Sequence, residues 1–298
     1  MRIGLLGTGP WAGFVHAPAL AAHPDVEFAG VWGRRPEAAA ELAAAHGVAA
    51  YPTVDALLAD VDAVAVALPP DVQAELAVRA AQAGKHLLLD KPVAATVDAA
   101  RAVEDAVAAS GVASVVFFTT RFTPGQDAWV AEQAATEGWF TAHCHWIGSV
   151  FTTDSPFAAS PWRQQKGALW DVGPHALSVL LPVLGEVERV TAVPGPADTV
   201  HLVLRHRDGA SATVTLSLTA PPAASARGAA VELRGTAGVT TLPDRDEQPV
   251  DAFGHAVDAL LTAARTGTAD ARDVRFGRQV VEVLAAAEEQ LLRGDGKS

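Results

Sequence analysis

The amino-terminal strand and turn constrain the fold of this chain more than any other stretch. Ile3 to Leu6 is a short apolar run that predicts a buried strand, and a helix-like segment, Gly13 to Ala22, follows it after a glycine-rich turn. The turn reads Gly-x-Gly-x-x-Ala, the spacing of a dinucleotide-binding fingerprint between a strand and a helix. Gly7 permits the tight turn, and Gly9 lets the backbone approach a pyrophosphate. We expect a dinucleotide to contact Gly7, Thr8, Gly9, Pro10 and Trp11.

Strands and helices keep alternating after this turn. The pattern predicts strands at Val26–Trp32, Ala63–Leu68, Leu87–Asp90 and Ser114–Phe118, and helices at Pro36–Ala45, Asp71–Ala83 and Thr96–Ala109. Repeated strand–helix units imply a parallel, doubly wound sheet, so we predict a Rossmann domain over residues 1–120. A methyltransferase that uses S-adenosylmethionine could begin in the same way, but it would normally require an acid at the end of the second strand.

The residues after the second predicted strand bear on which dinucleotide binds. Gly33, Arg34 and Arg35 stand where an acid would bind an unphosphorylated ribose. Arginine instead accommodates a 2′-phosphate, because a guanidinium can hold phosphate through two hydrogen bonds and can stack on the adenine. This favours NADP(H) as the cofactor, with NAD(H) as the alternative. The alternative without a binding role is that both arginines are only solvent-exposed residues of the loop before the next helix.

A lysine follows the buried run of three leucines. In open α/β sheets, ligands bind just beyond the carboxyl ends of the strands, so Lys91 is placed to reach a ligand. Pro92 biases Lys91 away from the helical region and towards an extended or turn geometry. Taken alone, a solvated lysine at a strand end is an equally good interpretation, and the rest of the chain decides between the two.

The alternation of strands and helices gives way to successive predicted strands in the second half of the chain. Strands are predicted at Trp139–Ile147, Val187–Val193, Thr199–His206, Ser211–Thr219, Ala229–Arg234 and Val239–Leu242. Asp208-Gly209 between two of these runs signals a hairpin, and strict alternation over Thr213–Thr219 indicates one buried and one polar face. We predict a carboxy-terminal α+β domain over residues 121–298, with an open, mainly antiparallel sheet. Two amphipathic helices, Phe253–Arg265 and Ala271–Arg293, either cover this sheet or pack back on the first domain.

A third motif lies between these strands, at Gly167 to His175. Pro174 suits the first turn of a helix, which places His175 near a helix amino terminus. The positive end of the helix dipole favours a neutral imidazole there, which suits a residue that exchanges a proton. Asp171 lies just before the helix and can orient a ligand or the histidine. An isolated histidine at such a position would more often be a satisfied, partly buried side chain.

Taken together, the Gly7–Ala12 turn, Asp90-Lys91-Pro92 and Gly167–His175 resemble the motifs of the Gfo/Idh/MocA oxidoreductase family along nearly the whole chain. The family's Glu-Lys-Pro appears with Asp90 in place of glutamate, and its Thr-Pro-x-x-x-His turn appears as Leu68 to Gln73, with glutamine in place of histidine. Its Arg-Phe after the sixth strand appears as Arg121-Phe122. The resemblance implies further cofactor contacts at Leu68, Pro69, Gln73, Asp90 and Lys91.

Composition excludes several classes of partner. A net charge of −12 argues against nucleic acid and anionic membranes, because both require a basic face. The amino terminus lacks a signal peptide, and no stretch of about eighteen apolar residues is apparent, so a cytoplasmic location is expected. The single cysteine, Cys144, excludes an internal disulfide. His143 and His145 flank it on one strand face, but they lack a third ligand at metal-binding spacing, so no metal is expected.

The resemblance implies an oxidoreductase whose substrate is a sugar, a polyol or a related hydroxyl or carbonyl compound, and Arg34 and Arg35 favour NADP(H) as its cofactor. We expect His175 to act as general acid or base, Lys91 to polarise the substrate oxygen and Asp171 to orient substrate or histidine. Further candidates for substrate contact are Arg121, Trp162 and Arg163. The resemblance also implies a homo-oligomer that forms through the second-domain sheet. A short-chain dehydrogenase is disfavoured because the chain has one tyrosine, Tyr51, without a lysine four residues later. A non-catalytic NADP(H)-binding sensor on the same fold is the other alternative.

Overall fold

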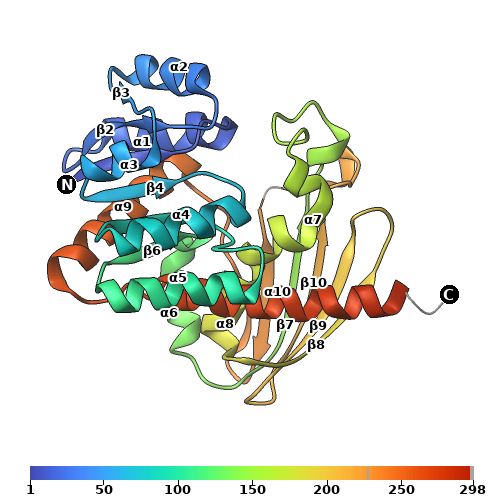
Figure 1. Ribbon diagram of the computed structural model, residues 1–298. Helices are drawn as coiled ribbons and strands as arrows, with labels where there is room; N and C mark the ends of the chain where they lie inside the picture. The colour runs from blue at the N-terminus through green and yellow to red at the C-terminus, as the bar shows by residue number, and fades with distance from the viewer. Residues whose placement is uncertain (227, 296–298) are drawn as a thin grey trace. The chain divides into compact units, whose positions relative to one another are not determined.

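The computed structural model describes residues 1–226 and 228–295, and the chain divides into two compact units (Figure 1). Unit 1 comprises Met1–Phe122 and Glu247–Val281, and unit 2 comprises Thr123–Asp246 and Glu282–Ser298. The sequence-based boundary was placed at residue 120, and residues 247–281, which were assigned to the second predicted domain, lie in unit 1 of the structure. These residues comprise a helix, Pro249–Thr266, and the start of the last helix, and buried side chains of the first, such as Phe253 and Leu260, belong to the core of unit 1.

Unit 1 contains a six-stranded sheet with the strand order β3-β2-β1-β4-β5-β6, and every neighbouring pair is parallel. The chain crosses from β3, at one edge of the sheet, back to β4, which pairs with β1. This change of direction is typical of the doubly wound sheet that the alternating strand–helix pattern predicts. Strands β4 and β6 are buried along their whole length, because helices cover both faces of a doubly wound sheet. The bounds are β1 Arg2–Leu6, β2 Glu27–Trp32, β3 Ala49–Ala50, β4 Ala63–Val66, β5 His86–Asp90 and β6 Ser114–Phe117.

The predicted helices of unit 1 are present, and further short elements accompany them. The first predicted helix is a π-helical turn, η1, that continues directly into α1. The short strand β3 and helix α3 were not predicted, because two exposed alanines and a six-residue helix carry little periodic signal. The bounds are η1 Ala12–His16, α1 Ala17–Ala22, α2 Pro36–His46, α3 Val54–Ala59, α4 Pro70–Gln82, α5 Val97–Ser110, η2 Thr119–Phe122 and α9 Pro249–Thr266; α10, Val274–Asp295, begins in unit 1 and ends in unit 2.

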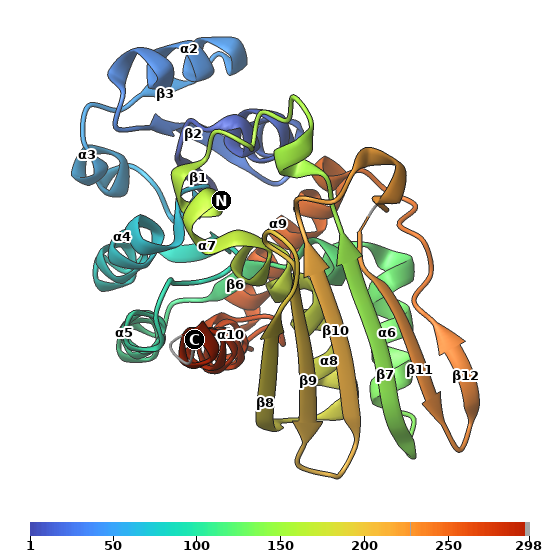
Figure 2. The same ribbon diagram turned by 90° about the vertical axis from the view of Figure 1, so that its right-hand side faces the viewer.

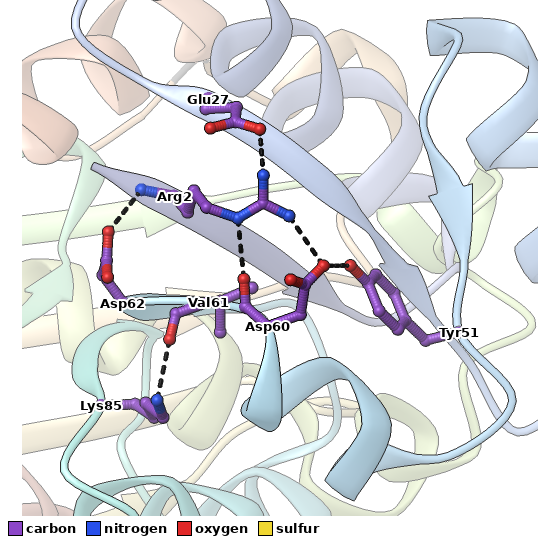
Figure 3. Close-up of polar contacts among 7 residues, drawn as sticks. All are labelled: Arg2, Glu27, Tyr51, Asp60, Val61, Asp62 and Lys85. Atoms are coloured by element: carbon purple, nitrogen blue, oxygen red, sulfur yellow. Dashed lines mark hydrogen bonds and ion pairs between the residues drawn. The ribbon is translucent and has the colours of Figure 1, made fainter.

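A polar network ties together the amino-terminal edge of the unit 1 sheet (Figure 3). The Arg2 guanidinium, on β1, forms ion pairs with Glu27 and with Asp60, the latter at 2.7 Å between Nη2 and Oδ2. The Tyr51 hydroxyl donates a hydrogen bond to the same Asp60 carboxylate. Gly7 lies beyond the other end of β1. The hydroxyl of the chain's one tyrosine is therefore committed to a structural contact with Asp60.

Unit 2 contains a second six-stranded sheet, with the order β12-β11-β7-β10-β9-β8. Its neighbouring strands are antiparallel except for β7 and β10, which pair in parallel, so the sheet is mixed and mainly antiparallel as predicted. The predicted hairpin joins β9 to β10, and Gly209 supplies the left-handed backbone, with φ 92°, that its turn requires. The bounds are β7 Trp139–Ile147, β8 Val187–Pro194, β9 Val200–His206, β10 Ser211–Ser217, β11 Ala230–Gly235 and β12 Gly238–Thr241.

Helices α6, Pro124–Ala134, and α8, Gly173–Leu184, lie against one face of this sheet (Figure 2). Strict alternation along β9 assigns the two faces: Leu202 and Leu204 are buried, whereas the alternate residues His201 and Val203 are exposed. The sheet therefore has one covered apolar face and one face that is exposed in the monomer. The remaining helical segments of this unit are η3 Val150–Thr152, α7 Pro161–Asp171 and η4 Pro222–Ala224.

The segment Pro161–Leu184, which consists of α7 and α8, is long and apolar enough to cross a membrane by length and composition. No such stretch was predicted from the sequence. Of its most apolar stretch of 18 residues, 78% is buried inside the protein, which is typical of a core helix. Gly167 also interrupts the segment with non-helical angles, φ 61° and ψ −161°. Its apolar character is therefore explained by packing within unit 2.

Candidate functional site

The glycine turn of unit 1 leaves an open space above the start of a helix. Gly7 has φ 130°, and a Cβ added there would lie 2.3 Å from the carbonyl oxygen of Ala67, so only glycine fits. A Cβ added at Gly9 would meet nothing within 4 Å. The two glycines thus differ, because the backbone requires glycine at residue 7, whereas residue 9 has open space beside it.

A cavity of about 350 Å³ adjoins this turn, which is within the size range of small-ligand sites. It brings together residues from the carboxyl ends of β1, β2 and β4, the position where open α/β sheets bind ligands. Pro10 and Trp11 were also predicted to contact a cofactor, but they do not line the cavity. Its lining residues are Thr8, Gly9, Gly33, Arg34, Arg35, Ala67, Leu68 and Pro69.

The charge of this cavity comes from two arginines. Arg34 and Arg35 are exposed at its rim, and none of the residues that line it carries a carboxylate. The structure gives a reason why residue 33 carries no carboxylate. A Cβ at Gly33 would lie 2.5 Å from the methyl group of the Thr8 side chain. An aspartate or glutamate at residue 33 would therefore require Thr8 to move. The ionisable side chains that line the cavity are therefore both cationic.

The segment Asp90–Val93, here called the lysine loop because it carries Lys91, follows from β5 at the same edge of the sheet. The Asp90 carboxylate, at Oδ1, accepts a hydrogen bond of 2.8 Å from the backbone N–H of Lys91. Gln73, which the resemblance suggested as a cofactor contact, is 1% exposed, and its amide binds the backbone around Lys91. Gln73 therefore belongs to the support of this loop. Its burial and its backbone partners are tertiary features that its position in the motif did not indicate.

In unit 2, the motif carboxylate is paired with an arginine. Asp171 is 6% exposed, and its Oδ2 accepts a hydrogen bond of 3.0 Å from Nε of Arg163. The Arg163 guanidinium lies over the rings of Trp162 and Phe157, at 4.9 Å and 5.2 Å from their centroids. Three residues predicted separately, Trp162, Arg163 and Asp171, therefore form one cluster. An ion pair this buried holds the carboxylate in a fixed orientation.

His175 lies in the first turn of α8, as predicted, directly after Pro174. It is 6% exposed, and the indole of Trp146 stacks on its imidazole with ring centroids 4.9 Å apart and an interplanar angle of 21°. Trp146 comes from β7 and points to the same sheet face as Cys144. The stack restricts the rotation of the imidazole. Sequence reasoning did not single out Trp146, because its contact with α8 is tertiary and leaves no local signal.

Arg121 lies in a buried charge network of unit 1. Its backbone carbonyl accepts a hydrogen bond of 2.5 Å from Nη1 of Arg272, which in turn pairs with Asp270. Burial raises the pKa of the Asp270 carboxyl, but hydrogen bonds from Arg272 and the charges of Arg272 and Arg121 outweigh this and hold the pKa below its ordinary value. Arg121 thus contributes to an internal ion network, a position that speaks against substrate contact.

Within the described part of the chain, no group of three or more histidine, cysteine, aspartate or glutamate side chains is arranged to hold a metal. Nδ1 of His143 lies 2.8 Å from the Thr213 hydroxyl on the exposed face of the unit 2 sheet. Cys144 points to the opposite, covered face, and burial raises the pKa of its thiol to about 12. These residues are therefore best explained as parts of the sheet.

Two family models match the chain. One, described as an oxidoreductase family with an NAD-binding Rossmann fold, matches residues 1–118. The other, described as the Gfo/Idh/MocA C-terminal domain, matches residues 141–241. Between them they leave out residues 119–140, which include helix α6, and residues 242–298, which include helices α9 and α10.

Individual proteins agree with these family matches. A levoglucosan dehydrogenase from Pseudarthrobacter phenanthrenivorans is 32% identical over 212 residues, which are 65% of this chain but only 53%, about half, of that relative's length. A D-xylose 1-dehydrogenase (NADP(+)) from Haloferax volcanii is 31% identical over 240 residues, 74% of this chain and 70% of the relative. The structure of the WlbA dehydrogenase from Bordetella pertussis, in complex with NADH and UDP-GlcNAcA, superposes with a TM-score of 0.85 at 22% identity, covering 99% and 96% of the two chains. All three are named as dehydrogenases, which gives no support to a non-catalytic sensor.

Proposed function

Because the chain belongs to the Gfo/Idh/MocA oxidoreductase family, we propose that it is an NADP-dependent dehydrogenase or reductase. Its substrate would be a sugar, a polyol or a related hydroxyl or carbonyl compound. The observation that carries the cofactor choice is the cavity at the glycine turn, which is lined by Arg34 and Arg35 and by no carboxylate. The two named relatives act, by their names, on levoglucosan and D-xylose, and one is named for NADP(+).

The proposed cofactor preference follows from charge. A 2′-phosphate adds negative charge at the rim where both arginines stand, and one charge-assisted hydrogen bond is worth about 1.5–3 kcal/mol, or roughly ten- to a hundredfold in affinity. We therefore expect NADPH to bind about ten- to a hundredfold more tightly than NADH. An unphosphorylated ribose would gain nothing from the guanidinium groups and would find no carboxylate for its hydroxyls.

Fluorescence titration of both reduced cofactors tests this preference. Arg34→Ala should weaken NADPH binding about tenfold or more and leave NADH binding nearly unchanged. The matched control is Arg265→Ala, which removes an exposed arginine from α9 outside the cavity and should change neither affinity. Equal affinities for the two cofactors in the wild-type protein would contradict the assignment.

We propose the following roles for the site residues. When bound, the nicotinamide cofactor supplies or accepts the hydride. His175 takes the proton of the substrate hydroxyl during oxidation and returns a proton during reduction, while the Lys91 ammonium polarises the same oxygen. Asp171, paired with Arg163 at 3.0 Å, holds a fixed negative charge in the motif and orients substrate or histidine. The stack of Trp146 on His175 supports this role, because a general base must be held in one orientation.

Substitution separates these roles from cofactor binding. Lys91→Ala and His175→Ala should each lower kcat by about 10²–10⁴ while NADPH still binds through the glycine turn. The two losses should be non-additive, because the double variant removes one proton-handling unit once. A His175→Ala protein with a lowered melting temperature and normal turnover would mean that the histidine is structural.

We also propose that the chain forms a homo-oligomer through the exposed face of the unit 2 sheet, and that it acts in the cytoplasm. Val193 on β8 and Val203 on β9 are 54% and 50% exposed on this face, next to the hydroxyls of β10. Burying such apolar area in an interface would be favourable. Val203→Glu should shift the mass measured by light scattering to that of a monomer, whereas Leu292→Glu on α10 should not. A monomeric wild-type protein at micromolar concentration would remove the proposal.

A further inference from the structure

The side chain of Gln73 is a buried amide whose polar atoms meet the backbone of the lysine loop. It lies in the first turn of α4, is 1% exposed and belongs to unit 1, as does Lys91. Its Oε1 accepts a hydrogen bond of 2.9 Å from the backbone N–H of Asp90. Its Nε2 donates to the carbonyl oxygens of Asp90, at 2.7 Å, and Pro92, at 3.0 Å, with a longer approach of 3.3 Å to that of Val93.

These contacts bracket one residue. Asp90 precedes Lys91 and Pro92 follows it, so a single amide holds the chain on both sides of the lysine. The Asp90 carboxylate adds a third restraint at the Lys91 N–H, at 2.8 Å. A loop after a strand would otherwise be free to move its backbone, and with it the direction of the lysine side chain. The Gln73 amide restricts this movement of the loop, and it does so from helix α4, which is itself part of the Rossmann domain.

The chemistry of the side chain matters for this role. A primary amide offers an acceptor and two donors in one plane, which matches one backbone N–H and several carbonyl oxygens. A carboxylate in its place would face those carbonyl oxygens with acceptors only, and a methionine of similar length would satisfy none of them. An asparagine keeps the amide but withdraws it by one methylene. The network therefore specifies glutamine, and each of these substitutions fails in a different way.

We propose that Gln73 is a positioning residue for Lys91: its amide fixes the Asp90–Val93 backbone so that the Lys91 ammonium is held where the reaction requires it. This inference rests on the proposed function of Lys91. It also links the two departures from the family's motifs, because the glutamine that replaces histidine binds both backbone polar groups of the aspartate that replaces glutamate.

Hydrogen exchange tests the contact without any assumption about activity. In Gln73→Met, the amide proton of Asp90 should exchange at least about tenfold faster than in the wild-type protein, because its acceptor is gone. The amide protons of Leu88 and Leu89 in the same strand are bonded within the sheet and should keep their rates. Unchanged exchange at Asp90 would show that the amide does not hold this backbone and would overturn the inference.

Kinetics test the positioning role. Gln73→Met should lower kcat about ten- to a hundredfold, since displacement of a catalytic group by about 1 Å can cost that much, while KM and the NADPH dissociation constant change less than about threefold. The matched control is Gln126→Met: Gln126 is a buried glutamine in the first turn of α6 that donates to the Pro243 carbonyl oxygen at 2.9 Å. It should lose comparable thermal stability and keep its kcat. If Gln73→Met does not fold, Gln73→Asn serves as the milder variant.

A double-mutant cycle with Lys91→Ala separates this inference from the proposed function. If Gln73 acts through the lysine, Gln73→Met should lower kcat less than about threefold further in the Lys91→Ala background. A normal kcat in Gln73→Met alongside a low kcat in Lys91→Ala would overturn the inference and leave the proposed function standing. A normal kcat in Lys91→Ala itself would overturn both, and this result does not depend on any Gln73 variant. Fully additive losses would also contradict the inference.

Discussion

His16 is a fully buried histidine whose protonation should make this fold sensitive to acid. It ends the π-helical turn η1, and its ring lies 4.1 Å from that of Phe253, with Phe117 at its edge at 6.2 Å between centroids. Among the described residues, neither ring nitrogen has a hydrogen-bond partner. Burial in this apolar cluster lowers the pKa of His16 from 6.5 to about 3. The imidazole is therefore neutral in the folded protein at any physiological pH.

The size of the effect follows from proton linkage. Because the folded pKa is depressed, the unfolded chain binds the extra proton as the pH falls below 6.5, and stability is lost from there down to about pH 3. At about pH 7.5 neither state is protonated and the contribution is close to zero. At about pH 5 the unfolded histidine is almost fully protonated and the folded one is not, which lowers the free energy of unfolding by about 2 kcal/mol. Below both pKa values the loss would reach about 5 kcal/mol.

Urea unfolding at about pH 7.5 and about pH 5 measures this term if His16→Met is studied beside the wild-type protein. The wild-type protein should lose about 2 kcal/mol more than the variant between the two conditions. Any packing cost of methionine cancels, because it is present at both pH values. Burial also lowers the pKa of His86 and His206, but these residues remain in both proteins and their contributions subtract. Equal pH dependence in the two proteins, or an imidazole resonance of His16 that titrates near pH 6.5, would refute the reasoning.

Two further predictions concern the glycine turn and the cysteine. Gly9→Ala should fold with wild-type stability, because its Cβ meets nothing within 4 Å, yet raise the NADPH dissociation constant about tenfold or more, measured by fluorescence titration. Gly7→Ala should instead destabilise the protein by about 1–3 kcal/mol in thermal unfolding, because φ is 130° there and the Cβ would strike the Ala67 carbonyl oxygen. The Cys144 thiol is buried with a pKa raised to about 12, so a thiol reagent should label it only as fast as the protein unfolds. Labelling of folded protein within seconds would contradict its placement on the covered sheet face.

The parallel, doubly wound sheet of unit 1 could be predicted because its signals are local. Short apolar runs, the glycine turn and helices of regular period repeat along the first part of the chain, and parallel strand–helix units connect in few ways. The assignment of Pro249–Thr266 could not be predicted in the same way. Its amphipathic pattern indicates a buried face, but Phe253 finds its partners in His16 and Phe117, which are distant in sequence. Periodicity identifies a buried face and does not identify what covers it.

The candidate site shows the same division. Gly7, Gly9, Gly33 and Arg34 were identified from the sequence because backbone conformation and charge at a known turn are properties of single positions. The burial of Gln73 was not, since a glutamine in a helix is ordinarily exposed and its four backbone contacts lie some twenty residues away. The stack of Trp146 on His175 and the pairing of Arg163 with Asp171 likewise depend on how strands and helices pack. Candidate site residues can therefore be proposed from single positions, whereas the residues that contact and support them depend on tertiary packing.

The measurement that tests the proposed function most directly is a single-turnover assay of NADPH oxidation against a panel of aldoses, ketoses and inososes, with NADP⁺ reduction by the corresponding alcohols as the reverse assay. We expect at least one pair to react with the wild-type protein, more slowly with NADH than with NADPH. His175→Ala should bind NADPH normally and react about 10²–10⁴ times more slowly on the same substrate. Tight NADPH binding without hydride transfer to or from any member of either panel would contradict the proposal and favour a cofactor-binding protein without catalysis.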